Sequence, residues 1–74
     1  MQKYLKGTRF KVTGQEFRIE NGMFEIIGHL PQADGDDYYI YRRVGIDGNL
    51  INDKSRHNQR GNFASNLDRV ATII

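Results

Sequence analysis

The side chains that most often carry acid–base, nucleophilic or metal chemistry are few in this sequence, and they do not converge. The two histidines, His29 and His57, stand in unrelated surroundings, and there is no cysteine. A zinc site takes several such ligands at short spacings that do not occur here, so each histidine is interpreted as a surface or strand-edge residue. The eight glycines do not form a phosphate-binding loop. We therefore expect no enzyme, no metal site, no cofactor and no small-molecule substrate.

Three carboxylates cluster in the stretch DGDDYY, at Asp34, Asp36 and Asp37. A calcium loop beginning at Asp34 would place Tyr39 where glycine is required and Gly45 where a bidentate glutamate is required, so this match fails. A paired-carboxylate acid–base site would need apolar surroundings that raise one pKa, and the neighbouring sequence does not supply them. We interpret the stretch as a solvated acidic turn beside a strand edge.

A binding surface is predicted where aromatic and basic residues alternate. Tyr39, Tyr41 and Arg43 share one face of a predicted strand, and such a face can stack unpaired bases when it is exposed. The alternative is that the tyrosines fill the rim of the core and keep their hydroxyl groups in water.

A basic loop at residues 54–60 is the second candidate surface. Its lysine and arginines suit phosphate contacts, and its asparagine and glutamine can read base edges, although any protein could carry a loop of this composition. Together the two patterns predict a nucleic-acid-binding protein. The predicted nucleic-acid-binding residues are Arg42, Arg43, Lys54, Arg56, Arg60, Tyr39 and Tyr41.

The charge is divided along the chain, and this division supports a second hypothesis. The formal net charge is +2, but residues 21–41 contain four acids and no base. A protein-binding module or inhibitor, of the kind made by phages or mobile elements, could present this acidic segment to a basic protein partner. The residues predicted for this alternative are Asp34, Asp36, Asp37 and Tyr38.

Strands must position these residues, and the first third of the chain predicts them. Phe10, Phe17 and Phe24 each begin a Phe-x-Val or Phe-x-Ile pattern, and they lie seven residues apart. Intervening glycines exclude a helix, and apolar residues two apart are typical of strands. We therefore predict a meander of three short strands with turns at Gly14-Gln15 and Asn21-Gly22.

This meander fixes a register. Phe10 and Phe24 would each lie opposite Ile19 of the middle strand, and a slip by one residue would expose the whole apolar face. Replacing Phe17 by alanine in the middle strand is therefore predicted to unfold the domain. The predicted core residues are Phe10, Val12, Phe17, Ile19, Phe24 and Ile26.

The middle of the chain is predicted to add a bulge, two strands and a loop. Ile27-Gly28 interrupts the alternation and indicates a bulge. Residues 38–44 are rich in strand formers, and Asp47-Gly48 indicates a hairpin that pairs Val44 with Ile51. Residues 52–62 contain no apolar residue and are predicted to form a surface loop.

The end of the chain is predicted to form a helical turn and a closing strand. Phe63, Leu67 and Val70 follow helical spacing behind Asn62 as a candidate N-cap. The β-branched segment that ends the sequence, residues 69–74, is then expected to pair with an early strand.

Residues 1–74 are therefore expected to form one mainly all-β domain. The order of elements resembles the small SH3-like barrels, in which a helical turn precedes the last strand, and implies a barrel of five or six strands. A twisted open antiparallel sheet with a helix on one face is the alternative. No apolar run approaches the roughly 20 residues that span a bilayer, so we expect a cytoplasmic protein without a membrane partner. The sequence leaves a homodimer open.

Overall fold

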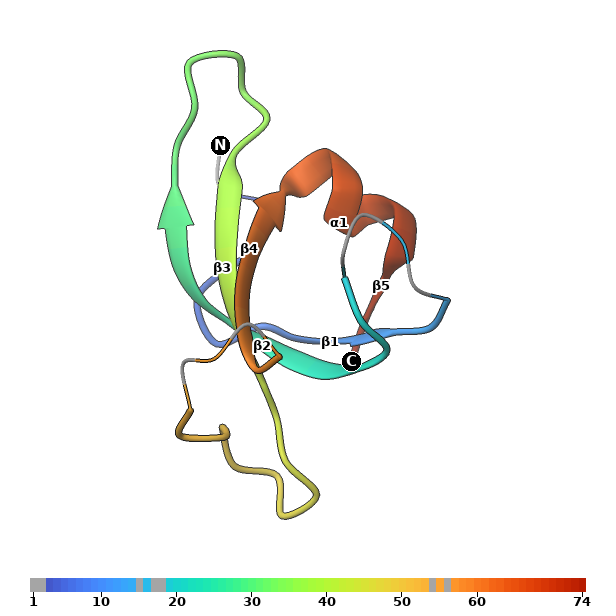
Figure 1. Cartoon of the computed structure of the whole chain (residues 1–74). Coiled ribbons are helices and arrows are strands. Elements are labelled where there is room, and N and C mark those ends of the chain that lie inside the picture. The colour runs from blue at the N-terminus through green and yellow to red at the C-terminus, as the bar shows by residue number, and fades with distance from the viewer. Residues whose placement is uncertain (1–2, 15, 17–18, 54, 56) are drawn as a thin grey trace.

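The computed structural model describes residues 3–14, 16, 19–53, 55 and 57–74. This part of the chain forms five β-strands and one α-helix (Figure 1), which confirms a mainly β domain with a short helix before the last strand. No helix in these ranges combines the length and the apolar character needed to cross a membrane. The elements are β1 (Arg9–Val12), β2 (Gly22–Leu30), β3 (Tyr38–Arg43), β4 (Gln59–Phe63), α1 (Ala64–Val70) and β5 (Ala71–Ile73).

The five strands form one antiparallel sheet in the order β4-β3-β2-β1-β5. The pairing of β2 with β3 shifts register between Ile26 and Gly28, which confirms the predicted bulge. A bulge bends its strand, and the sheet curls around its core (Figure 1). β4 and β5 remain separate edges, so the expected SH3-like barrel is wrong and the open sheet is correct.

The predicted meander is wrong because β1 pairs directly with β2. Phe10 lies opposite Phe24, whereas the prediction placed Ile19 opposite both rings. β5 occupies the other edge of β1, so β1 has no edge left for a middle strand. Ile19 instead forms an isolated bridge with Glu16. Phe17 and its predicted unfolding variant lie outside the described residues.

The apolar side chains predicted for this region nevertheless form the core. The rings of Phe10 and Phe24 are stacked with their centroids 5.7 Å apart, and Tyr41 packs edge-on against both. Leu67 of α1 is buried in the same cluster. Burying each of these large side chains contributes roughly 1.5 to 3 kcal/mol to folding. The predicted core residues that are buried are Phe10, Val12, Ile19, Phe24 and Ile26.

The chain ends in a helix and a closing strand, as predicted. α1 buries Ala64, Leu67 and Val70, and β5 pairs with β1. The predicted N-cap is wrong, because Asn62 pairs with β3 as part of β4 and the cap position falls on Phe63. Continuation of the β3–β4 ladder through Phe63 delays the start of the helix by one residue.

The loop predicted at residues 52–62 is wrong in its last part, since β4 begins at Gln59. An edge strand tolerates polar residues because much of its surface faces water. The turn at Asp47-Gly48 forms, with the Gly48 N–H donating to the carbonyl oxygen of Gly45. Val44, however, bridges Leu50 rather than the predicted Ile51.

Candidate functional site

Tyr39 and Tyr41 point into the core, so the exposed stacking face predicted for them does not form. Their side chains are 0% and 1% exposed. The Tyr39 hydroxyl accepts hydrogen bonds from the backbone N–H groups of Lys3, at 2.8 Å, and Tyr4, at 3.2 Å. Burial raises the pKa of Tyr41 to about 12, and its hydroxyl has no hydrogen-bond partner among the described residues. The alternative prediction, that the two rings fill the core rim, is closer, but their hydroxyl groups are not in water.

Arg43, the third member of that predicted face, is folded against the protein. Its guanidinium lies over the Phe24 ring, 4.8 Å from the centroid. Nη1 donates to the backbone oxygen of Asn21 at 3.0 Å, and Nη2 lies 3.6 Å from the carboxylate of Glu20. Arg43 therefore covers the ring of Phe24 and does not contribute to an exposed stacking face.

The other predicted basic residues do not form one patch. Arg42 points away from the core, on the opposite face of β3 from Tyr41, and bonds Gln59. Arg60 lies in β4 opposite Tyr41. Lys54 and Arg56 of the predicted basic loop lie outside the described residues.

The acidic turn holds parts of the fold together. Asp36 accepts hydrogen bonds from the backbone N–H and the hydroxyl of Ser65, at 2.8 and 2.7 Å, so it satisfies a donor in the first turn of α1. Asp37 bonds His29 Nε2 at 2.7 Å and accepts the backbone N–H of Gln32 at 3.1 Å. The hydrogen bond with His29, and then that with Gln32, lower the pKa of Asp37.

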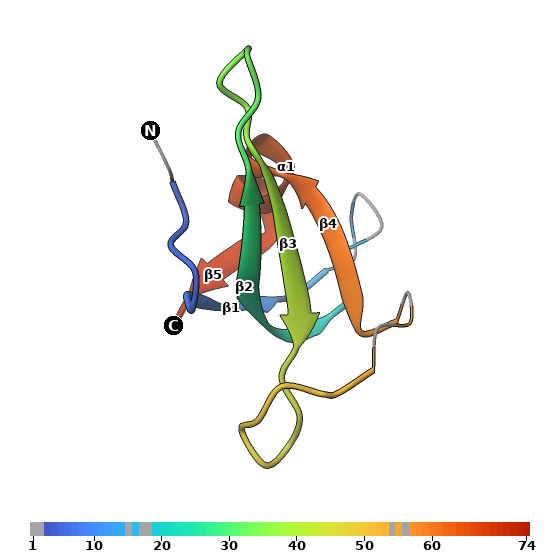
Figure 2. The ribbon, with the colours of Figure 1, turned by 90° about the vertical axis from the view of Figure 1, so that its left-hand side faces the viewer.

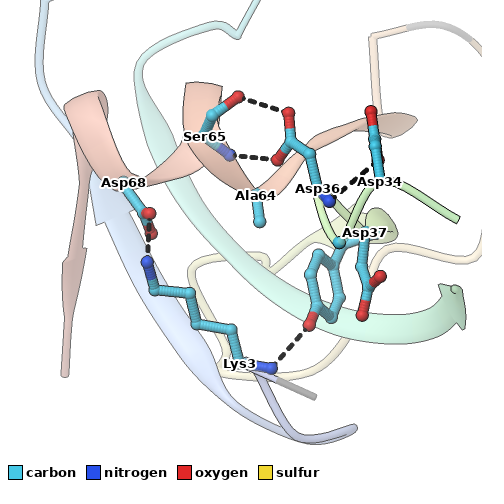
Figure 3. Close-up of a pocket in the computed structure, with 9 residues that line it drawn as sticks. Lys3, Asp34, Asp36, Asp37, Ala64, Ser65 and Asp68 are labelled. Carbon is cyan, nitrogen blue, oxygen red and sulfur yellow. Dashed lines mark hydrogen bonds and ion pairs between the residues drawn. The ribbon is translucent and has the colours of Figure 1, made fainter. Parts of the chain in front are cut away.

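The same turn borders a pocket of about 450 Å³, shown in Figure 3. Lys3 pairs there with Asp68, and Asp34 accepts the backbone N–H of Asp36 at 3.0 Å. Within the described ranges, no group of three or more histidine, aspartate or glutamate side chains could hold a metal ion. The contacts around this pocket tie the acidic turn to α1, and α1 to the start of the chain.

The two histidines occupy different places in the fold. His29 lies in β2 with its ring stacked on Tyr39, the centroids 4.9 Å apart, and with Asp37 as its hydrogen-bond partner. His57 is exposed, as predicted, and its Nδ1 lies 3.1 Å from the carboxylate of Glu20. Each imidazole therefore has a carboxylate partner.

The side of β2, β3 and β4 that faces away from the core, here named the outer face, carries exposed apolar side chains. Directly paired residues share a face, so Leu30, Tyr38 and Phe63 form one row across the three strands. Leu30 is 50% exposed and Phe63 42%. Figure 2 looks onto this side of the sheet and shows α1 behind it. We define the outer patch as Leu30, Tyr38, Ile40 and Phe63.

Glycines in the next row hold the outer patch flat. Ile40 lies between Gly28 and Gly61, which have no side chains to rise above the sheet. The end of the Tyr38 ring lies over Gly61, where an added Cβ would come within 2.3 Å of a ring carbon. The Tyr38 and Phe63 rings meet edge to face, with centroids 5.2 Å apart.

Beyond the patch, the outer face is charged. Arg9, Glu25, Arg42 and Gln59 form a row across four strands. Arg9 Nε donates to Glu25 Oε1 at 2.9 Å, and Arg42 Nε donates to Gln59 Oε1 at 3.1 Å. Lys11 is exposed one row further. We name Arg9, Lys11 and Arg42 the basic strip.

Sequence reasoning missed Phe63, which it placed on the helix, and gave Tyr38 only to the protein-binding alternative. In the stretch Tyr38-Tyr39-Ile40-Tyr41, large apolar or aromatic side chains occur on both faces of the strand. The alternation pattern alone therefore does not tell which face points into the core. The pairing of β3 with β2 and β4 turns Tyr39 and Tyr41 inward and Tyr38 and Ile40 outward. The sequence signal for this arrangement was Gly61, two residues before Phe63, because a residue without a side chain leaves room for a neighbouring ring to lie across its strand.

Comparisons with protein-family models, with curated proteins and with solved structures found no match to this chain.

Proposed function

We propose that this protein is a non-enzymatic binding domain that takes single-stranded nucleic acid on its outer face. Bases stack on Tyr38 and Phe63, and phosphates lie near the basic strip. The observation that carries this proposal is the pair of neighbouring aromatic rings, Tyr38 and Phe63. Phe63 is 42% exposed, and Arg42 lies on the same face two rows further along the sheet.

The aromatic rings favour a single strand over a duplex. Bases in a duplex are stacked on one another, so their faces cannot reach a sheet, whereas an unpaired base can lie on an aromatic ring. Such stacking contributes about 1 to 3 kcal/mol for each base. Gly61 leaves room for the Tyr38 ring to lie across β4, and the Phe63 ring stands beside it with its plane at 79°, so the two rings can accept bases in different orientations.

The charges of the outer face are compatible with a polyanion. The rows of the basic strip contain three basic residues, Arg9, Lys11 and Arg42, and one acidic residue, Glu25. The whole chain has a formal net charge of +2. The Arg9–Glu25 pair compensates part of this charge. Binding should therefore be modest in strength and sensitive to salt, because phosphate contacts release counterions.

A protein partner is the second candidate function, and one observation favours it. Leu30 and Ile40 add aliphatic surface to the outer patch, which a protein interface uses and stacked bases do not require. Tyrosine is also enriched among the residues that dominate protein interfaces. The acidic-turn form of this hypothesis has less support, because Asp36 and Asp37 are engaged within the protein.

The first experiment titrates a fluorescent mixed-sequence single strand, and its duplex, with the protein at 50 and 200 mM salt. We expect the single strand to bind more tightly than the duplex. Contacts to about three phosphates give a logarithmic salt slope near −2, so affinity should fall roughly 20-fold between the two conditions. Tyr38→Leu and Phe63→Leu should each lower affinity about tenfold, because leucine keeps apolar contact but removes the stacking ring.

Ile46→Ala is the matched control, since this side chain is fully exposed in the turn after β3 and should leave binding unchanged. Lys54→Ala and Arg56→Ala test the contribution predicted for the basic loop. Absence of single-strand binding at 50 mM salt would remove the nucleic-acid proposal and leave the protein partner. Equal loss in Ile46→Ala and Phe63→Leu would show that the outer patch is not the binding surface.

A further inference from the structure

Arg42 and Gln59 form a side-chain pair on the outer face whose outward groups are all donors. Both Nε and Nη2 of Arg42 donate to Oε1 of Gln59, the first at 3.1 Å. An arginine side chain has no acceptor, so the amide oxygen of Gln59 must face it and the amide nitrogen must point elsewhere. The one acceptor oxygen of the pair, Oε1 of Gln59, is therefore bonded within the pair, while several N–H groups can still donate to a ligand.

The remaining donors have a defined geometry. Gln59 occupies the Nε side of the guanidinium, which leaves the end formed by Nη1 and Nη2 as a planar fork of N–H groups. The Gln59 amide nitrogen adds two further donors beside it. Because Gln59 holds the guanidinium in place, less conformational entropy is lost when the fork binds a partner.

A donor fork of this kind matches some bases better than others. Guanine has two neighbouring acceptors, O6 and N7, on one edge, and arginine bonds them with two parallel hydrogen bonds. Adenine and cytosine place an amino donor on the corresponding edge, which would face the donors of Arg42 and Gln59. Thymine and uracil offer a single carbonyl oxygen there.

We propose that the Arg42–Gln59 pair gives this protein a preference for guanine at one position of a bound single strand. The inference rests on the proposed function, since it names the base that the outer face selects. Position along the sheet supports it: Arg42 lies on the same face and the same strand as Tyr38, four residues away, which is about 13 Å at the usual rise of a strand. A strand whose bases stack on the outer patch can therefore place a further base beside the fork.

The experiment compares short oligothymidine strands that carry a single central guanine, adenine or cytosine with the unsubstituted strand. We expect the guanine strand to bind about 5- to 10-fold more tightly than the adenine strand and the unsubstituted strand, at the low end of the discrimination that bidentate contacts give. The cytosine strand should lie between them, because unpaired cytosine exposes N3 and O2 as neighbouring acceptors. In Arg42→Lys the charge is retained but the fork is lost. This variant should lose the preference for guanine, so that its affinity for the guanine strand falls to that for the unsubstituted strand.

Gln59→Ala is the second variant, since it frees the guanidinium that Gln59 orients and should reduce the guanine preference while leaving the charge intact. Urea denaturation of both variants checks that they are folded. If strands bind with equal affinity whatever the central base, or if Arg42→Lys weakens all strands equally, Arg42 contacts phosphate and the inference is wrong while the proposed function stands. If no strand binds at all, the proposed function itself fails.

Discussion

At the scale of single residues, β3 carries two buried tyrosines whose hydroxyl groups have opposite effects on the stability of the fold. Tyr39 accepts hydrogen bonds from two backbone N–H groups near the start of the chain, so its hydroxyl ties that segment to the sheet. Tyr41 buries its hydroxyl without a partner among the described residues, which costs free energy that its ring contacts must offset. Two residues of one type in one strand thus affect stability differently.

This difference can be measured with the same substitution at both positions. Tyr39→Phe leaves the N–H groups of Lys3 and Tyr4 without their acceptor and should lower the free energy of unfolding by about 1 to 3 kcal/mol. Tyr41→Phe removes a buried unpaired hydroxyl and should leave the stability unchanged or raise it by up to about 1 kcal/mol. Urea denaturation followed by circular dichroism gives both values. A larger loss in Tyr41→Phe than in Tyr39→Phe would contradict this assignment.

At the scale of elements, β4 is a polar edge strand that nevertheless supports an aromatic surface. Its central residue is Gly61, and the Tyr38 ring from β3 covers the place where a side chain would stand. Gly28 sits in the same row on β2, yet a Cβ there would meet Ile40 only at ordinary contact distance, 3.4 Å. The two glycines therefore have different roles despite their equivalent places in the sheet.

The corresponding prediction compares Gly61→Ala with Gly28→Ala. The added methyl group at residue 61 must displace Tyr38, so this variant should lose about 1 to 3 kcal/mol of stability and should also bind single strands more weakly. Gly28→Ala should change stability by less than about 1 kcal/mol, because its neighbour can adjust. Thermal and urea denaturation measure the first effect, and strand titration measures the second. Similar behaviour of the two variants would mean that the Tyr38 ring does not depend on Gly61.

At the scale of the whole molecule, carboxylates from several loops and from α1 stabilise the fold in their charged form. The pKa of Asp37 is lowered by hydrogen bonds from His29 and Gln32, that of Asp47 by Asn49 and that of Asp53 chiefly by Ser55. Desolvation raises the pKa of Asp68, but hydrogen bonds from Lys3 and Tyr4 outweigh it and the net shift is downward. All four anions are thus more favourable in the folded chain than in the unfolded chain.

The sign of the resulting pH dependence follows from these shifts. In the unfolded chain these groups take up protons near their ordinary pKa of 3.8, and in the folded chain they do so at lower pH. The stabilisation they provide is therefore fully present above about pH 5 and is lost as the pH falls below 4. Urea midpoints at pH 7, 5, 4 and 3 should show this decline, and Asp37→Asn should make it less steep. A midpoint that stays constant or rises between pH 4 and pH 3 would contradict it.

The pattern of residue types was sufficient to predict the part of the core that β1 and β2 contribute. Phe10, Val12, Phe24 and Ile26 alternate with polar residues, and alternation fixes the buried face of a strand wherever that strand pairs. The bulge after Ile26, the helix near the end and the closing strand also follow from local signals of turn chemistry and helical spacing. These features depend on neighbours in the chain.

The partners of each strand, and hence the face that each tyrosine occupies, depend on contacts between residues distant in the sequence. β2 takes the edge of β1 that the predicted meander gave to a middle strand, and β5, from the end of the chain, takes the other edge. Once β3 pairs with β2 beyond the bulge, Tyr39 and Tyr41 turn inward and Tyr38 turns outward beside Phe63. Local spacing is equal for both arrangements, and long-range pairing alone distinguishes them.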